Sequence, residues 1–233
     1  MWQFLVEGGP VMFLLVIASI VSVAFIIERG LALRWKKVVP PEVERVVENC
    51  RSTGEVSMVR HVCEQVASPL SRLLLIGIQH LDWPKAENAN ALETRARHEV
   101  LKLERGLVVL EILVGISPLL GLVGAVQGLI VLFGDIGVKG VSDNAIVAKG
   151  IAIALHTTLA GLLVAIPTLI AWSYYNKKVE TLTVELENIC DDFLRKQYRF
   201  GEEQAAAPAP AGAAKEVSRP AVPQSAPTAA AKA

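Results

Sequence analysis

Three long apolar stretches divide the chain into membrane-length and polar segments. Residues 8–27, 112–134 and 150–176 contain no Asp, Glu, Lys or Arg. About 20 apolar residues, rising 1.5 Å each, cover the roughly 30 Å hydrocarbon core of a bilayer. Because backbone polar groups in lipid must be paired within their own segment, each stretch is predicted to be an α-helix. The pattern therefore predicts an all-α membrane protein with three transmembrane helices.

Apolar residues also recur at helical spacing in the long polar segment. Short helices are predicted over about 41–52, 56–66 and 69–81. A longer helix is predicted after Asp82-Trp83-Pro84, because proline is tolerated in a first helical turn. Its apolar stripe runs into the second apolar stretch, which predicts one unbroken helix standing out of the membrane. The stripe consists of Leu92, Ala96, Val100, Leu103, Leu107 and Leu110.

A second apolar stripe continues beyond the third stretch. Its spacing of three, four, three and four residues is typical of a short coiled coil. It can pack against the long helix of the same chain or against further copies of the chain, and the sequence leaves both open. The stripe consists of Val179, Leu182, Leu186, Ile189 and Phe193.

The positions of Lys and Arg predict the orientation. Thirteen of the 23 fall between Arg29 and Arg105, eight follow the third stretch, and only Lys139 and Lys149 lie between the second and third. Basic residues concentrate on the cytoplasmic side, so the N-terminus is predicted outside and the C-terminus inside. Since the basic residues follow the first stretch rather than precede it, we expect a retained span and not a cleaved signal peptide.

These patterns predict a specific organisation. Transmembrane helices are expected at 10–35, 107–134 and 150–176, with an external N-terminus at 1–9 and an external loop at 135–149. The cytoplasmic parts are expected to be a helical loop and a helix, followed by an Ala- and Pro-rich tail whose composition is typical of disorder. These three parts span 36–106, 177–200 and 201–233.

The motifs of common enzymes are absent from the sequence. It contains no phosphate-binding loop, nucleophile elbow or dinucleotide fingerprint. Cys50, Cys63 and Cys190 form no C-x-x-C pair, and the histidines match no metal-ligand spacing. We therefore predict no conventional enzyme, no cofactor, no metal and no nucleic-acid partner.

Small residues line one face of each of the last two apolar stretches. Such residues let membrane helices approach closely, and Ser and Thr hydroxyls bond between them, so tight packing alone accounts for both faces. Pro118 and Pro167 can bend their helices and free carbonyl groups. Thr158 and Ala125 each lie roughly 12–14 Å below the external end of their helix, and so in one layer of the membrane. The two faces are Gly150, Ala154, Thr158, Gly161, Ala165 and Thr168, and Ser117, Gly121, Gly124, Ala125 and Gly128.

Two motifs resemble signatures of the ExbB/TolQ/MotA proton-channel family. SPLLGLVGAVQGLI (117–130) resembles A-P-x-x-G-L-L-G-T-V-x-G. GIAIALHTTLAGLLVAIP (150–167) resembles G-I-x-E-A-L-x-T-T-x-x-G-L-x-x-A-I-P. The apolar opening that closes on IIERGLALRWKK (26–37) also fits, and the likeness covers about residues 1–200. Three predicted spans match the ExbB/TolQ branch and not MotA, which has four.

The resemblance implies a stator subunit of the bacterial inner membrane that uses the proton-motive force. Members of this branch form homopentamers around the transmembrane helices of a partner, ExbD or TolR, whose aspartate carries the proton. ExbB energises TonB-dependent uptake and TolQ serves envelope processes, so a TonB- or TolA-like protein would be an indirect partner. The sequence does not choose between these roles. The external side would be the periplasm.

The resemblance also assigns candidate residues. The family threonine of the third span falls on Thr158, with Thr157 beside it, and such threonines help to line the proton path. The family threonine of the second span falls on Ala125, and the family acidic residue falls on Ile153. Neither side chain can form a hydrogen bond or carry charge. The sequence therefore leaves open an alternative, a non-conducting membrane scaffold of the same fold.

Three further residues are candidates for the proton path. Ser117 belongs to the small face of the second span. His156 is a candidate because imidazole groups commonly relay protons in proteins, although a membrane histidine is more often hydrogen-bonded to a neighbouring helix. Glu111 stands at the cytoplasmic foot of the second span, where it either marks the proton exit or is simply solvated.

Overall fold

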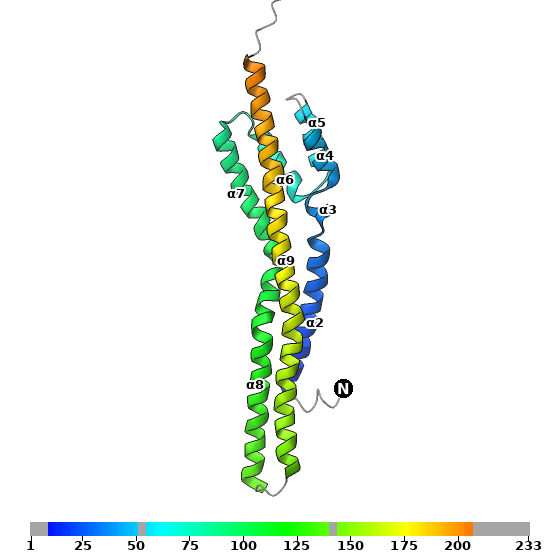
Figure 1. The fold of residues 1–233 in the computed structure, drawn as a ribbon, viewed down its shortest axis with the longest axis vertical. Helices are drawn as coiled ribbons and strands as arrows, with labels where there is room; N and C mark the ends of the chain where they lie inside the picture. Colours follow the sequence, from blue (N-terminus) through cyan, green and yellow to red (C-terminus); the bar gives the residue numbers. More distant parts are fainter. Residues whose placement is uncertain (1–8, 51–54, 140–143, 207–233) are drawn as a thin grey trace, which may run out of the picture.

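The computed structural model describes residues 9–50, 55–139 and 144–206 (Figure 1). Within these ranges the regular structure is helical and contains no strand. Three helices are long, and five short helices lie between the first and second of them. The long helices are α2 (Gly9–Ala32), α8 (Leu107–Lys139) and α9 (Asn144–Ala206). The short ones are α3 (Trp35–Val38), α4 (Pro41–Asn49), α5 (Val56–Gln65), α6 (Pro69–Gln79) and α7 (Lys85–Glu104).

Three helices are long and apolar enough to cross a membrane. They are α2, α8 and the first part of α9, and they pack side by side (Figure 1). Their outer surface is apolar: Phe13, Phe133 and Leu155 are 66%, 67% and 66% exposed. A surface of this kind suits lipid or further subunits and not water. The prediction of an all-α membrane protein with three spanning helices is confirmed.

The two helices that flank the predicted external loop extend into it. α8 continues to Lys139 and α9 begins at Asn144, so the described part of 135–149 is helical. Residues 140–143 lie outside the described residues. The length of an apolar span predicts the minimum extent of a helix. It does not predict where the helix ends, because the backbone hydrogen bonds of the helix can continue past the lipid boundary. The tail predicted at 201–233 lies mostly outside the described residues, and α9 continues to Ala206.

The prediction of one unbroken helix into the second span is wrong. α7 ends at Glu104 and α8 begins at Leu107, with a turn at Arg105 and Gly106. The guanidinium group of Arg29, from the end of α2, occupies the place where a side chain on Gly106 would lie. Nη1 of Arg29 donates a hydrogen bond to the Leu103 carbonyl oxygen at 3.3 Å. The interruption therefore accommodates a side chain from a distant part of the sequence.

Local sequence signals account for the short helices. Ser68 caps α6, because its hydroxyl accepts a hydrogen bond from the Ser71 backbone N–H at 3.0 Å, and Pro69 follows in the first turn. α4 likewise begins with Pro41, and α7 begins directly after Pro84. All three short helices predicted between 41 and 81 are present, with ends a few residues earlier than predicted.

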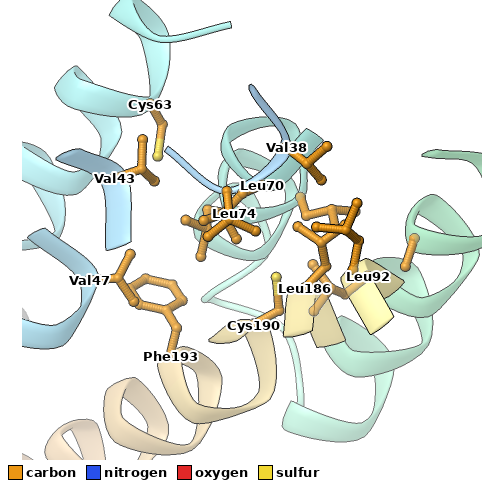
Figure 2. Close-up of a cluster of buried hydrophobic side chains, with 14 of the residues drawn as sticks. Val38, Val43, Val47, Cys63, Leu70, Leu74, Leu92, Leu186, Cys190 and Phe193 are labelled. Carbon is orange, nitrogen blue, oxygen red and sulfur yellow. The ribbon is translucent and has the colours of Figure 1, made fainter. Parts of the chain in front are cut away.

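The short helices and the distal part of α9 enclose a hydrophobic cluster, here called the extramembrane core (Figure 2). Leu70 and Leu74 from α6 meet Phe193 from α9, and Val43 and Val47 approach from α4. The predicted stripe on α9 lies in this core: Val179, Leu182, Leu186 and Phe193 are all buried, and Ile189 is partly buried. Packing of the stripe within its own chain is confirmed, and its packing against further copies stays a prediction.

One buried carboxylate organises the surface of this core. Glu99 of α7 has a side chain only 1% exposed. It accepts hydrogen bonds from Arg72 of α6 (Nε at 2.9 Å, Nη2 at 2.5 Å) and from Lys102 (Nζ at 2.9 Å). Arg95 Nε lies 3.6 Å from its second oxygen. Burial raises the pKa of Glu99, but the hydrogen bonds from Arg72 and Lys102 outweigh this and hold its pKa below the usual value.

We expect Glu99→Gln to destabilise the protein by about 1–3 kcal/mol at pH 7, because it removes a buried charge that three cations face. Since the folded pKa of Glu99 is depressed, the stabilisation is present above the unfolded value of about 4.3 and is lost as the pH falls through the folded value. In detergent at pH 7 the variant should therefore unfold at a lower temperature than the native protein. This difference in unfolding temperature should become smaller below about pH 4.

The matched control is Glu93→Gln, on the same helix. Glu93 is exposed and pairs with the exposed Arg97 at 2.6 Å. We expect this change to alter stability by less than about 0.5 kcal/mol. Equal effects of the two substitutions would contradict the role of Glu99.

Candidate functional site

The backbones of α8 and α9 touch through facing glycines. A Cβ atom on Gly161 would lie 2.6 Å from the Ser117 carbonyl oxygen, and one on Gly121 would lie 2.9 Å from the Thr157 carbonyl oxygen. Both distances are shorter than non-bonded atoms allow. Only glycine therefore fits at these two positions without moving the opposite helix.

The same contact continues along both helices. A Cβ on Gly124 would lie 2.9 Å from Cβ of Thr157, and one on Gly150 would lie 2.8 Å from Cβ of Leu132. Gly128 leaves ordinary contact distance, 3.5 Å, to the Ala154 backbone nitrogen. The two small faces identified in the sequence therefore meet, and tight helix packing is one of their functions.

The two adjacent threonines have different positions. Both hydroxyls donate to the same acceptor, the Ala154 carbonyl oxygen, at 3.0 Å from Thr157 and 3.2 Å from Thr158. The side chain of Thr157 points into the α8–α9 contact and the residue is 1% exposed, whereas Thr158 is partly exposed. Thr157 therefore lies inside the helix pair and Thr158 at its edge.

On α8 the candidate residues divide in the same way. Ser117 is fully buried and its hydroxyl donates to the Leu113 carbonyl oxygen at 2.6 Å. Ala125 is partly exposed. Because its neighbour Gly124 faces Thr157, Ala125 lies in the same layer as Thr158, as the depth estimate predicts. Ala125 and Thr158 thus border the contact that Ser117 and Thr157 fill.

Neither His156 nor Glu111 lies beside Thr158 at the edge of the α8–α9 contact. His156 is exposed, and its Nδ1 lies 2.6 Å from the Ala152 carbonyl oxygen on the side of α9 away from α8. Glu111 is exposed in the second turn of α8, fourteen residues before Ala125, which is about 21 Å along the helix. Any role of these two residues lies at a distance from Thr158.

A hydroxyl pair that the sequence analysis missed joins the first span to the third. Ser22 Oγ of α2 lies 2.6 Å from Thr168 Oγ1. Because Thr168 donates to the Val164 carbonyl oxygen at 2.6 Å, Ser22 is the donor of the pair. Both residues are buried. The available signal was a serine within an otherwise apolar span, and it does not by itself indicate which helix it contacts.

These groups can assist proton transfer but cannot carry a proton alone. A threonine hydroxyl that donates to its own helix still offers lone pairs to a protonated carboxyl group, and after rotation it can donate to a carboxylate. Residues 112–134 and 150–176 contain no Asp or Glu, so the helices supply no carboxylate at this depth. A carboxylate that loads and unloads protons beside Thr158 would have to come from another chain. The described residues also hold no cluster of His, Cys, Asp and Glu suited to a metal ion.

The sequence matches one protein-family description, the MotA/TolQ/ExbB proton channel family, over residues 65–188. This range runs from the end of α5 through the α8–α9 contact into the distal part of α9. It therefore includes both small faces and only part of the extramembrane core, since Val43, Val47 and Phe193 lie outside it.

Individual relatives extend the match toward the N-terminus. The chain is 34% identical over 176 residues to an ExbB-like biopolymer transport protein of Synechocystis sp., which covers 71% of this chain and 66% of that protein. It is 28% identical over 197 residues to an ExbB homologue of Methanothermobacter thermautotrophicus, covering 84% of this chain and 68% of that protein. A biopolymer transport protein ExbB of Neisseria meningitidis is 27% identical over 205 residues, with 80% of this chain and 91% of that protein covered. The chain thus spans about two thirds of the length of the first two.

We expect Gly161→Ala to destabilise the protein by about 1–3 kcal/mol, because the new methyl group would overlap the Ser117 carbonyl oxygen, a backbone atom that cannot rotate away. The control is Gly115→Ala, since a Cβ there meets no atom within 4 Å. Removing a helical glycine at such a site should be neutral or stabilising by up to about 1 kcal/mol. Thermal unfolding in detergent measures both, and a neutral Gly161 variant would contradict direct backbone contact.

Proposed function

Because the chain belongs to the MotA/TolQ/ExbB proton channel family, we propose that it is an ExbB-type subunit of a proton-driven membrane motor. The observation that carries the proposal is Thr158, a hydroxyl at the edge of a glycine-packed helix pair that has no carboxylate of its own at that depth. The protein acts through proton transfer and force, not through covalent catalysis.

The absence of a carboxylate from the second and third apolar stretches supports a partner that supplies one. We propose that a single-span protein of ExbD/TolR type places an aspartate beside Thr158, inside a homopentameric ring of this chain. A charged, unpaired carboxylate within a membrane costs several kcal/mol. A hydroxyl lowers that cost at one rotational position and not at the next, so loading and unloading of the proton is coupled to rotation. The motor would then act on a TonB- or TolA-like protein.

The proposed roles follow the positions of the residues. Thr158 and Ala125, at the edge of the helix pair, line the path, while Thr157 and Ser117 support it from within the pair. Glu111, exposed near the foot of α8, is the proposed proton exit. His156 faces away from α8 and is the least suited of the predicted residues to contact the same proton.

The proposed location is the inner membrane of a bacterium, with the N-terminus in the periplasm. The thirteen basic residues between Arg29 and Arg105 support this orientation, because Lys and Arg are enriched on the cytoplasmic side of membrane proteins, where we propose that α3–α7 lie. The extramembrane core is then cytoplasmic.

A second candidate function is a non-conducting scaffold of the same fold. Ala125 and Ile153 favour it, because each stands where the family pattern has a polar residue and neither can hydrogen-bond through its side chain. In that case the helix pair would hold a partner without passing protons.

We expect Thr158→Val to abolish proton flux while leaving the assembly intact, since valine keeps the shape of threonine and removes only the hydroxyl. The measurement is proton flux into liposomes that contain this chain together with the proposed single-span partner of ExbD/TolR type. Thr157→Val is the matched control: it removes the adjacent hydroxyl, which also bonds to Ala154, from within the helix pair. That variant should keep most of the flux.

Two results would count against the proton-path proposal. Full flux in Thr158→Val would refute the role of that hydroxyl. No flux in the native complex, with the partner bound, would favour the scaffold.

A further inference from the structure

On one flank of α7 the basic side chains outnumber the carboxylate that they contact. Arg72, Arg95 and Lys102 surround the single buried carboxylate of Glu99, which leaves an excess of two positive charges. The three basic side chains remain 39%, 39% and 51% exposed. Nε of Arg95 is buried and has no hydrogen-bond acceptor within the described residues. This surface, here called the basic flank, can therefore accept further negative charge.

The opposite flank of α7 forms a groove with α9. Two hollows lie along it, of about 280 Å³ beside Leu92 and Leu186 and about 320 Å³ beside Val100 and Val179. The floor of the first hollow is mainly apolar, that of the second is mixed because Asn176 and Thr183 contribute to it, and both rims are acidic. The rim carboxylates are Glu93, Glu104, Glu180, Glu187 and Asp191. This surface is here called the acidic groove.

Only part of the acidic rim is neutralised within the chain. Glu93, Glu180 and Asp191 pair with neighbours on their own helices, namely Arg97, Lys177 and Arg195. Within the described part of the chain, Glu104 and Glu187 form no ion pair. The groove therefore has two unpaired carboxylates, which equals the excess of two cations on the basic flank.

The two surfaces lie at the same height on opposite sides of α7. Arg95 is two residues from Glu93, and Lys102 is two residues from Glu104, so each pair is about 200° apart around the helix and about 3 Å apart along it. Glu187 lines the same hollow as Glu93 and so lies near the level of Arg95. A membrane holds every copy of a spanning protein at one depth. Complementary flanks at equal height are what a closed ring of copies requires.

We propose that the acidic groove of one copy of this chain binds the basic flank of the next copy, with Arg95 beside Glu187 and Lys102 beside Glu104. The contact is heterologous, so each copy uses a different surface toward each neighbour, and repetition closes a ring. The apolar floor beside Leu92 and Leu186 excludes water around the Arg95–Glu187 pair, which strengthens it relative to an exposed pair. The proposal rests on the ring assembly proposed above and identifies the surface that builds it.

Cross-linking between differently tagged copies tests the contact in the intact complex. One copy carries Arg95→Cys and the other Glu187→Cys, and a short bis-maleimide is used because an Arg–Glu pair holds its backbones further apart than a disulfide spans. The native thiols should give little background: Cys50, Cys63 and Cys190 are buried, and burial raises the pKa of Cys63 to about 11 and that of Cys190 to about 12. Both substitutions should fold, since Arg72 and Lys102 still bind Glu99 and Glu187 is exposed.

The expected product is an adduct that contains both tags. The matched control replaces Arg95→Cys with Arg97→Cys, an exposed arginine on the acidic side of the same helix, and should give at least about tenfold less adduct. An adduct only between two Arg95→Cys copies would indicate a two-fold contact and overturn the proposal. An adduct of Glu187→Cys only with a different protein would assign the groove to a partner and also overturn it.

Charge reversal provides a measurement that needs no cross-linker. Glu104→Lys combined with Glu187→Lys should shift the complex toward smaller assemblies in native mass spectrometry, by at least about tenfold in apparent association. Glu185→Lys combined with Asp192→Lys, an equal charge change on the other side of α9, should not. If the native protein forms a ring that the first pair leaves unchanged, this contact is wrong while the proposed function stands. If the native protein forms no ring, both fall.

Discussion

Direct backbone contact between α8 and α9 is the constraint on which the rest of the membrane part depends. Within lipid the hydrophobic effect does not drive apolar helices together. Their association therefore depends on close approach and on hydrogen bonds from hydroxyl groups. Facing glycines such as Gly121 and Gly161 permit that approach. As a result, one whole face of each helix is buried against the other helix. Every other group, including the hydroxyl of Thr158, must then act from the edge of the contact.

The same division into buried and edge positions gives the polar residues separate tasks. Ser117, Thr157 and Thr168 are buried and satisfy carbonyl groups inside the helix packing. Ser22 adds a bond from α2 to α9, so a hydroxyl pair as well as shape holds these two spans in register. Outside the membrane-spanning part, ion pairs connect the helices. Glu99 of α7, for example, binds Arg72 of α6. The chain thus uses neutral polar groups where charge is costly and ion pairs where water is near.

The sequence alone was sufficient for the features that repeat along one helix. Three apolar spans, the meeting of the two small faces and the burial of Leu182 and Leu186 all follow from periodicity. Contacts between distant segments could not be read in this way. The interruption at Gly106 depends on Arg29, 77 positions earlier, and the Ser22–Thr168 pair joins residues 146 apart. Periodicity assigned Thr158 to the small face of the third span, but Thr157 is the threonine that points into the contact and Thr158 lies at its edge, because the position of α8 decides which of two adjacent residues is buried.

The continuity of α9 has a mechanical consequence. It is one helix of 63 residues, about 95 Å long, whereas α7 and α8 are separated by the turn at Gly106. A bend or tilt of α8 can be absorbed at that turn, whereas α9 runs from the membrane half to Phe193 without a turn, and Pro167 is the point within it where a backbone hydrogen bond is missing. The layer that holds Thr158 and the far end of the molecule therefore belong to one continuous helix that can bend at Pro167, whereas α7 and α8 can change their mutual angle at Gly106.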